Sequence, residues 1–421
     1  MTAIVAVLNK HAVAIAADSA ATISSSNNKK VFNTANKVFT LSKYHPVAVA
    51  IYNNSELVGV PWEIAIKEYR KHLGENSFPT LKEYVDDFFA FIKQSNYFTD
   101  EAGHKYHLKS LMLSFLNDAI RNVRGSNVTM MGIPLASGIS AVLDNMISDV
   151  SKKTVIPAFA NVTKESFKKY INVEIDEILA DLSGNLSVVI DKEKLLTAMF
   201  YMFTRLEKMP AFSGVVFCGY GEKEIFPSLH SYVLQHVIEG NLSVVKLGDT
   251  HINLKDDVAI IPFAQIDVMQ TLIDGVAPVV KDIYFHGLAD PIRSLLIDIS
   301  KQVRPASKKI ADNIDRFVKK GLQKYIDDYI DLCDKQRDAR YTKPLVNSVS
   351  MLEKEDLADF SESLISITSV KRKMSLTEQN TVGGPIDVLV LSKGDGAIWM
   401  KRKHYFDPVL NPNFFETYLK H

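Results

Sequence analysis

Residues 3–8 read AIVAVL and residues 12–17 read AVAIAA, with the polar triplet Asn9-Lys10-His11 between them. Both runs are nearly continuous in Ala, Val and Ile, which is typical of strands that are buried on both faces. Because a sheet of this kind needs a layer above and below it, helices are expected to cover each side. The sequence therefore predicts a buried hairpin that starts within the first few residues of the chain.

The rest of the chain alternates between strand and helix patterns. A loop rich in Ser, Asn and Lys (residues 24–30) precedes two predicted strands, residues 37–41 and 46–52. From about residue 57 the apolar side chains recur at helical spacing. Further blocks of strands and helices follow, and the chain closes with a predicted hairpin around the turn at residues 393–396, KGDG.

The order of strands, helices, strands, helices and strands favours one discontinuous α+β layer structure with two helical insertions. In this interpretation the strands at both ends of the chain belong to the same core. The predicted parts are the first part of the core at residues 1–98, a helical insertion at 99–208, the central strands at 209–262, a second helical insertion at 263–350, and the last helix and strands at 351–421.

Composition narrows the class of protein. The 421 residues include 49 basic and 49 acidic side chains, so no net charge would attract nucleic acid or an anionic membrane, and neither partner is expected. The apolar start has no basic region before it and is broken after eight residues, so a signal peptide is not expected. The two cysteines, Cys218 and Cys333, suit a reducing compartment and are expected to be buried. Together these features predict a cytoplasmic protein.

The second residue carries the most distinctive chemistry. Thr2 is small enough for removal of Met1, which would leave a free amine on the same residue as a hydroxyl nucleophile. That amine, with a reference pKa of about 7.7–8.0, can act as the base that activates the hydroxyl. The predicted hairpin returns Asp18 to the start of the first strand, and Lys37 opens a later strand. A lysine ammonium paired with Asp18 would keep the Thr2 amine neutral.

These residues carry a family resemblance. The segment from Thr2 to Thr22 resembles the start of proteasome β-subunits and the related bacterial HslV-type peptidases, with Asp18-Ser19 and Thr22 in register. Residues 37–41, KVFTL, resemble the lysine strand of that family. The rival lysines Lys29 and Lys30 fall in the predicted loop and lack this apolar continuation.

Two later segments extend the resemblance. Residues 215–221, VVFCGYG, resemble the central hairpin of the family, and residues 381–391, TVGGPIDVLVL, resemble the glycine pair that leads into its last core strand. The likeness covers roughly residues 2–95, 211–265 and 352–402. It implies the four-layer αββα sandwich of N-terminal nucleophile (Ntn) hydrolases, with helical insertions and an acyl-enzyme on Thr2. It also implies that the reaction needs neither a metal nor an organic cofactor.

The sequence departs from the family pattern at its helper residues. The supporting Asp and Ser before the glycine pair are replaced by Gln379 and Val382, and a helper serine turn is replaced by residues 262–265, PFAQ. Gln265, Gln379 or Glu378 are therefore the candidate substitutes that hydrogen-bond the terminal amine.

The predicted oxyanion donor is a backbone N–H that stabilises the tetrahedral intermediate. In the family it lies in a glycine-rich turn, but here the turn is IYNN at residues 51–54. A main-chain donor survives this change, whereas the side chains of Tyr52 and Asn53 are expected to narrow the substrate groove. Ser19 and Thr22 complete the predicted substrate-binding set.

The leading functional hypothesis is a threonine peptidase that cleaves peptide or unfolded protein, with Thr2, Asp18 and Lys37 as its catalytic set. Two alternatives stay open: an Ntn hydrolase of small amides, and a noncatalytic assembly or adaptor protein of the same fold. Family analogy implies a ring-like homo-oligomer, which the helical insertions could alter. An ATPase or adaptor partner is left undetermined.

Three other motifs point to different chemistry. His104-x-x-His107 has the spacing of metal ligands, but it has no partnering acid motif and is interpreted as a surface pair in a loop. The glycines at 219 and 221 lack the ending of a phosphate-binding loop and are interpreted as a strand turn. Asp387 is either a hydrogen-bond acceptor at a strand edge or part of the active site, and the first interpretation is favoured.

Overall fold

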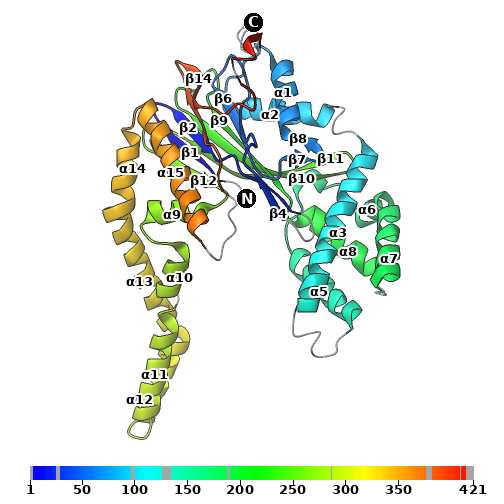
Figure 1. Ribbon diagram of the computed structural model, residues 1–421. Coiled ribbons are helices and arrows are strands. Elements are labelled where there is room, and N and C mark those ends of the chain that lie inside the picture. The colour runs from blue at the N-terminus through cyan, green and yellow to red at the C-terminus, as the bar shows by residue number, and fades with distance from the viewer. Residues whose placement is uncertain are drawn as a thin grey trace. The chain divides into compact units, whose positions relative to one another are not determined.

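The computed structural model describes residues 3–24, 29–95, 100–125, 134–186, 190–285, 287–375, 382–407 and 409–413. It is a mixed α+β structure with two five-stranded antiparallel sheets (Figure 1). The chain forms two compact units. Unit 1 comprises Met1–Ala35, Ile252–Val390 and Ile398–His421, and unit 2 comprises Asn36–His251 and Leu391–Ala397.

The sheet of unit 1 is built around the predicted N-terminal hairpin. Its strand order is β12-β1-β2-β13-β14, so β1 and β2 are inner strands. Every residue of both strands is buried, which confirms the interpretation of the two continuous apolar runs. The strands are β1 (Ile4–Asn9), β2 (Val13–Ala17), β12 (Val258–Phe263), β13 (Asp387–Ser392) and β14 (Gly396–Lys401).

One face of this sheet packs against helix α15 (Lys354–Met374). Val5 and Val7 of β1 form a core with Leu357 and Leu364 of that helix. Two further helices, α11 and α12, run antiparallel as a narrow arm (Figure 1). Apart from α15, the helices of unit 1 are α9 (Ile266–Asp274), α10 (Pro278–Phe285), α11 (Ala289–Val303), α12 (Lys308–Lys320), α13 (Leu322–Arg337) and α14 (Lys343–Ser350), with a π-helical turn at Asp338–Thr342.

The sheet of unit 2 contains the predicted central strands. Its order is β11-β10-β9-β6-β5, and β9 and β10 are buried along their full length. The register of β10 and β11 shifts twice along the pair. The strands are β5 (Val38–Thr40), β6 (Val47–Asn53), β9 (Ser213–Gly219), β10 (Ser228–Ile238) and β11 (Asn241–His251), with a separate short pair, β7 (Glu56–Leu57) and β8 (Val60–Pro61).

Two groups of helices belong to unit 2. Helices α1 and α2 pack on its sheet through aromatic side chains, where Phe88 contacts Trp62 and Phe217. The remaining helices surround a second apolar core that includes Phe203 and reaches Ile238 of β10. The helices are α1 (Trp62–Leu73), α2 (Leu81–Gln94), α3 (Glu101–Gly125), α5 (Leu135–Val150), α6 (Lys164–Tyr170), α7 (Asn172–Leu186) and α8 (Lys192–Arg205), with a 3₁₀ turn at Pro157–Phe159.

Three local predictions were wrong. Residues 29 and 30 are not in a loop, because β4 (Lys29–Phe32) pairs with β3 (Ala21–Ser24) as a two-stranded ribbon. Backbone pairing holds the two strands together, and the two lysines are followed by the apolar residues Val31 and Phe32. His104 and His107 are not a surface pair in a loop, since both lie in α3 and His104 is buried. Cys218 is buried as predicted, but Cys333 is partly exposed.

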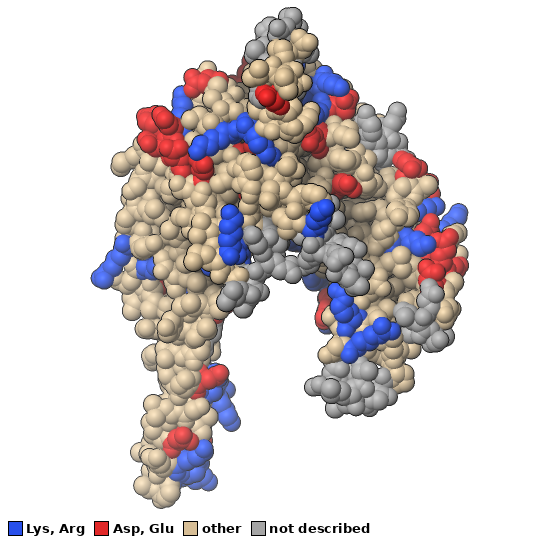
Figure 2. Space-filling view, viewed as in Figure 1, with Lys and Arg blue, Asp and Glu red and all other residues tan. Residues whose placement is uncertain are grey.

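The surface carries both signs of charge. Basic and acidic side chains are interspersed on the face shown in Figure 2, as the equal numbers of the two kinds lead one to expect. Among the helices that the structure describes, none combines the length and the apolar character needed to cross a membrane.

Candidate active site

Asp18 lies at the end of β2, next to the start of β1, and is almost completely buried. Its Oδ1 accepts a hydrogen bond from the backbone N–H of Ala3 at 2.9 Å. Its Oδ2 accepts from the N–H groups of Gly383 at 3.0 Å and Ala20 at 3.2 Å. A buried carboxylate with three N–H donors is a strong local constraint, because hydrogen bonds to a charged acceptor are stronger than neutral ones. Asp18 therefore fixes the residue that follows Thr2.

The predicted glycine pair meets the same end of the sheet. The N–H of Ser19 donates to the carbonyl of Gly383 at 3.1 Å, and the Ser19 hydroxyl donates to the carbonyl of Pro385 at 2.5 Å. Gly384 has φ +76°, a left-handed conformation that favours glycine. Ser19 is buried and has a structural contact, so its predicted contact with substrate stays a prediction.

The third strand at this end is β12. Phe263 of β12 lies opposite Ile4, just as Ala17 of β2 does, so the residues after Phe263 flank the start of β1 on its other side. Ala264 and Gln265 both have positive φ, at 53° and 49°. Such conformations are uncommon for residues other than glycine and are over-represented at functional sites. Gln265, the predicted helper, is thus placed beside the start of β1, directly before α9.

A buried ion-pair cluster that was not predicted from the sequence lies in the same unit. Asp387, 1% exposed, accepts a hydrogen bond from the backbone N–H of Lys403 at 2.9 Å and forms ion pairs with the side chains of Lys403 and Arg402. Burial lowers the pKa of Lys403, against the raising effects of Asp387 and of the Asp18 charge. Asp387 is therefore the acceptor that was predicted, and a second lysine lies within electrostatic reach of Asp18.

Lys37 belongs to unit 2. It is buried directly before β5, and its carbonyl accepts a hydrogen bond from the N–H of Ile51 at 2.8 Å. The relative positions of the two units are not determined, so the predicted pair of Lys37 with Asp18 stays a prediction.

The predicted oxyanion turn also lies in unit 2. Asn53 has φ +70°, the left-handed conformation that a glycine would adopt, and Asn tolerates it better than most residues do. Its side-chain amide donates to the carbonyls of Pro210 and Phe212, both at 2.8 Å. Tyr52 is buried against Phe212 and Gly214, and burial raises its pKa to about 12. These contacts show how the turn forms without glycine, and the predicted narrowing of a groove stays a prediction.

Four predicted site residues have no described side chain. Thr2 and Gln379 lie outside the described residues, as does Glu378. Thr22 lies in β3 opposite Val31, and only its backbone is described.

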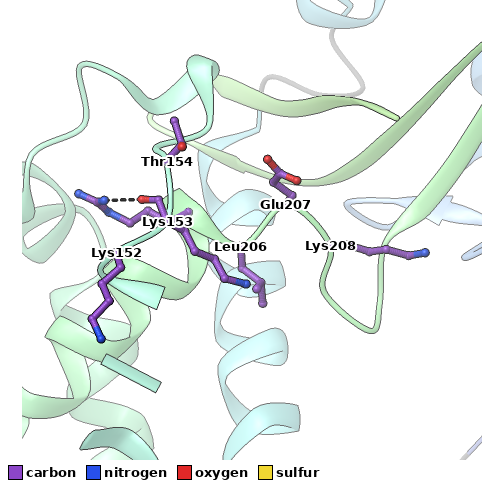
Figure 3. Close-up of a pocket in the computed structure, with 7 residues that line it drawn as sticks. Lys152, Lys153, Thr154, Leu206, Glu207 and Lys208 are labelled. Carbon is purple, nitrogen blue, oxygen red and sulfur yellow. Dashed lines mark hydrogen bonds between the residues drawn. The ribbon is translucent and has the colours of Figure 1, made fainter. Parts of the chain in front are cut away.

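A pocket of about 460 Å³ lies elsewhere, within unit 2 (Figure 3). The side chain of Arg205 donates a hydrogen bond to the carbonyl of Lys153 at 2.6 Å there. Neither Asp18 nor Lys37, the described members of the predicted catalytic set, lines this pocket. Its lining is mainly cationic and consists of Lys152, Lys153, Thr154, Arg205, Leu206, Glu207 and Lys208.

Comparisons with known proteins do not identify the chain: no family model matches its sequence, and a search of curated proteins finds no match.

Proposed function

We propose that the chain is an N-terminal threonine hydrolase of the proteasome-like Ntn class, with an αββα sandwich as its core, and that it cleaves peptide amide bonds. The observation that carries this proposal is the hydrogen-bonding of Asp18. Its buried carboxylate joins Ala3, the residue after the proposed nucleophile, to Gly383 of the glycine pair. Two segments quoted for the family resemblance, 365 residues apart, therefore meet at one carboxylate.

The proposed reaction has two halves. After removal of Met1, the Thr2 hydroxyl attacks the amide carbonyl while the Thr2 amine takes its proton. A backbone N–H in the turn at Tyr52 and Asn53 stabilises the tetrahedral oxyanion. The proton passes to the leaving amine as the C–N bond breaks, and an ester on Thr2 remains. Water then attacks the ester, the amine again takes and returns the proton, and the acid product leaves a regenerated Thr2.

The basicity of the Thr2 amine has to be controlled by nearby charge. In this proposal the Lys37 ammonium keeps the amine neutral and Asp18 orients Lys37. Lys403 is the competing candidate, because its partly buried ammonium interacts electrostatically with both Asp387 and Asp18. Lys37→Ala is expected to abolish turnover while Lys403→Ala retains it. The reverse result would transfer the role to Lys403.

The test is hydrolysis of an unfolded protein, a set of fluorogenic peptides and a set of small synthetic amides by the full chain. Thr2→Ala is expected to abolish cleavage, while Thr197→Ala, a matched substitution in α8, leaves it unchanged. Cleavage of small amides alone would replace the peptidase by a small-amide hydrolase. Inactivity of a chain shown to begin at Thr2 toward all three substrate classes would favour the noncatalytic adaptor. Light scattering of the same preparation tests the proposed homo-oligomer.

A further inference from the structure

Three potential metal ligands lie together on two neighbouring strands of unit 2. In the antiparallel pair β10 and β11 (Figure 1), His230 is directly opposite Asp249, and His251 is two residues further along β11. Residues two apart on a strand point to the same face of a sheet. The three side chains therefore share one face, and one ligand atom from each lies within 4.8 Å of the others.

The innermost of these side chains lacks the partners that burial requires. His230 is 3% exposed, and neither of its ring nitrogens has a hydrogen-bond partner among the described residues. Leaving a buried polar group unpaired is destabilising, because the group loses its hydrogen bonds to water and gains none in the protein. Burial, followed by the nearby His251, lowers the pKa of His230 to about 4. A ligand bound to one of the ring nitrogens would supply the missing partner.

The other two members are half open to solvent. The side chain of Asp249 is 40% exposed and that of His251 is 53% exposed, and His251 Nε2 lies 3.1 Å from Asp249 Oδ2. Lys246 lies 2.9 Å from the other carboxylate oxygen, Oδ1. Asp249 is held as a carboxylate, because hydrogen bonds from Lys246 and then His251 lower its pKa. Solvent can reach the cluster from this side.

We propose that His230, Asp249 and His251 bind a divalent transition-metal ion of the zinc type, with a position left open for water. Two imidazole nitrogens and one carboxylate oxygen suit zinc and its neighbours, whereas calcium and magnesium prefer oxygen ligands alone. In a tetrahedral site with bonds of about 2.0–2.1 Å, the ligand atoms are roughly 3.3 Å apart. Because the ligand atoms now lie up to 4.8 Å apart, the two exposed side chains must move inward by about 1.5 Å, which rotation at the surface permits.

The simpler explanation is a surface network in which Lys246 and His251 neutralise Asp249. That network accounts for two of the three proposed ligands but leaves His230 unpaired. The ammonium of Lys246 also competes with a metal for the carboxylate, so its removal should strengthen metal binding. The metal-site explanation therefore predicts that substitution of Lys246 strengthens metal binding, whereas the surface-network explanation predicts no such gain.

The test is titration of the chelator-treated full chain with Zn²⁺ by calorimetry and with Co²⁺ by visible absorption. We expect one ion per chain at micromolar affinity or tighter, with the intense visible bands of tetrahedral Co²⁺. Because both residues are exposed, His251→Ala and Asp249→Asn should fold, and each should weaken binding at least tenfold. Lys246→Ala should bind Zn²⁺ at least as tightly as the unaltered chain does.

His11→Ala is the matched control, because His11 is an exposed histidine 4.0 Å from a single carboxylate, that of Glu353. It should leave the affinity unchanged. Equal affinity of the unaltered chain and His251→Ala, or no binding below millimolar Zn²⁺, would overturn the site. Binding of Ca²⁺ or Mg²⁺ as tight as that of Zn²⁺ would show that the ligands are oxygen atoms alone and would overturn the assignment of the two imidazole nitrogens as metal ligands.

Discussion

Asp18→Asn is the substitution for which the structure gives the clearest expectation. The variant keeps the shape of the side chain but loses its charge and one acceptor. The remaining oxygen can accept from Gly383 and Ala20, as Oδ2 does now. The new NH₂ group would then face the N–H of Ala3, which loses its partner at 2.9 Å.

The cost follows from these contacts. Loss of one charge-assisted hydrogen bond costs about 1.5–3 kcal/mol, and the two that remain weaken to neutral strength. Because Asp18 is only 1% exposed, water cannot replace the lost partner. We expect the free energy of unfolding of unit 1 to fall by about 3 kcal/mol.

Urea unfolding measures this change, and hydrogen exchange followed by mass spectrometry localises it to residues 3–20 and 382–390. The control is Asp257→Asn in the same unit, where the carboxylate pairs with Lys10 at 3.2 Å and both side chains are 35% exposed. Such a pair contributes less than about 1 kcal/mol. Equal losses in the two variants, or unchanged exchange in the two segments, would refute the reasoning.

Two further predictions concern a glycine and a buried histidine. Gly384→Ala should destabilise the protein by more than about 1 kcal/mol, because φ is +76° and a Cβ would lie 2.9 Å from Asn33. The control is Gly394→Ala, which has open space around the added Cβ and should change the free energy of unfolding by less than about 0.5 kcal/mol. Chemical denaturation compares the two, and equal effects would contradict the argument. Burial lowers the pKa of His236 to about 3, so the unfolded chain binds more protons and stability falls as the pH drops from about 6.5 towards 3. This histidine alone should cost about 2 kcal/mol between pH 7 and pH 5. The variant His236→Gln keeps a donor for the carbonyl of Phe203 but cannot take up this proton. Between pH 7 and pH 5 it should therefore lose about 2 kcal/mol less stability than the unaltered protein, and the same pH dependence in both would disprove the prediction.

The parts of the fold that follow from local pattern could be predicted from the sequence. The first hairpin was predicted because its apolar runs are continuous, and both strands are buried throughout. The strand at Lys29–Phe32 was missed because its two lysines continue a run of Ser and Asn that is typical of a loop, and only strand pairing identifies them. The left-handed conformation of Asn53, which takes the place of glycine in the turn, was not predicted, because residue type is the only sign of such a φ in a sequence.

The candidate sites depend on contacts of two different ranges. Pairing across a hairpin can be counted from its turn: the turn at Glu239-Gly240 brings His230 opposite Asp249, and the turn at Gly394 brings Lys403 close to Asp387. A symmetric count around the first turn finds its pair, whereas the same count around Gly394 places Lys401 opposite Asp387, two residues before Lys403. The contact of Asp18 with Gly383 spans 365 residues and follows from no such local rule, so it was not predicted from the sequence.

The central claim is that Thr2 is the nucleophile, and the intact mass of the purified protein before and after treatment with an epoxyketone tests it most directly. This probe reacts with both the hydroxyl and the free amine of an N-terminal threonine. The account predicts loss of Met1 and one stoichiometric adduct on Thr2, absent in Thr2→Ala and in Lys37→Ala. Retention of Met1 with no adduct would contradict the hydrolase and leave the noncatalytic adaptor, while a trimmed but unreactive Thr2 would point to a narrowed pocket.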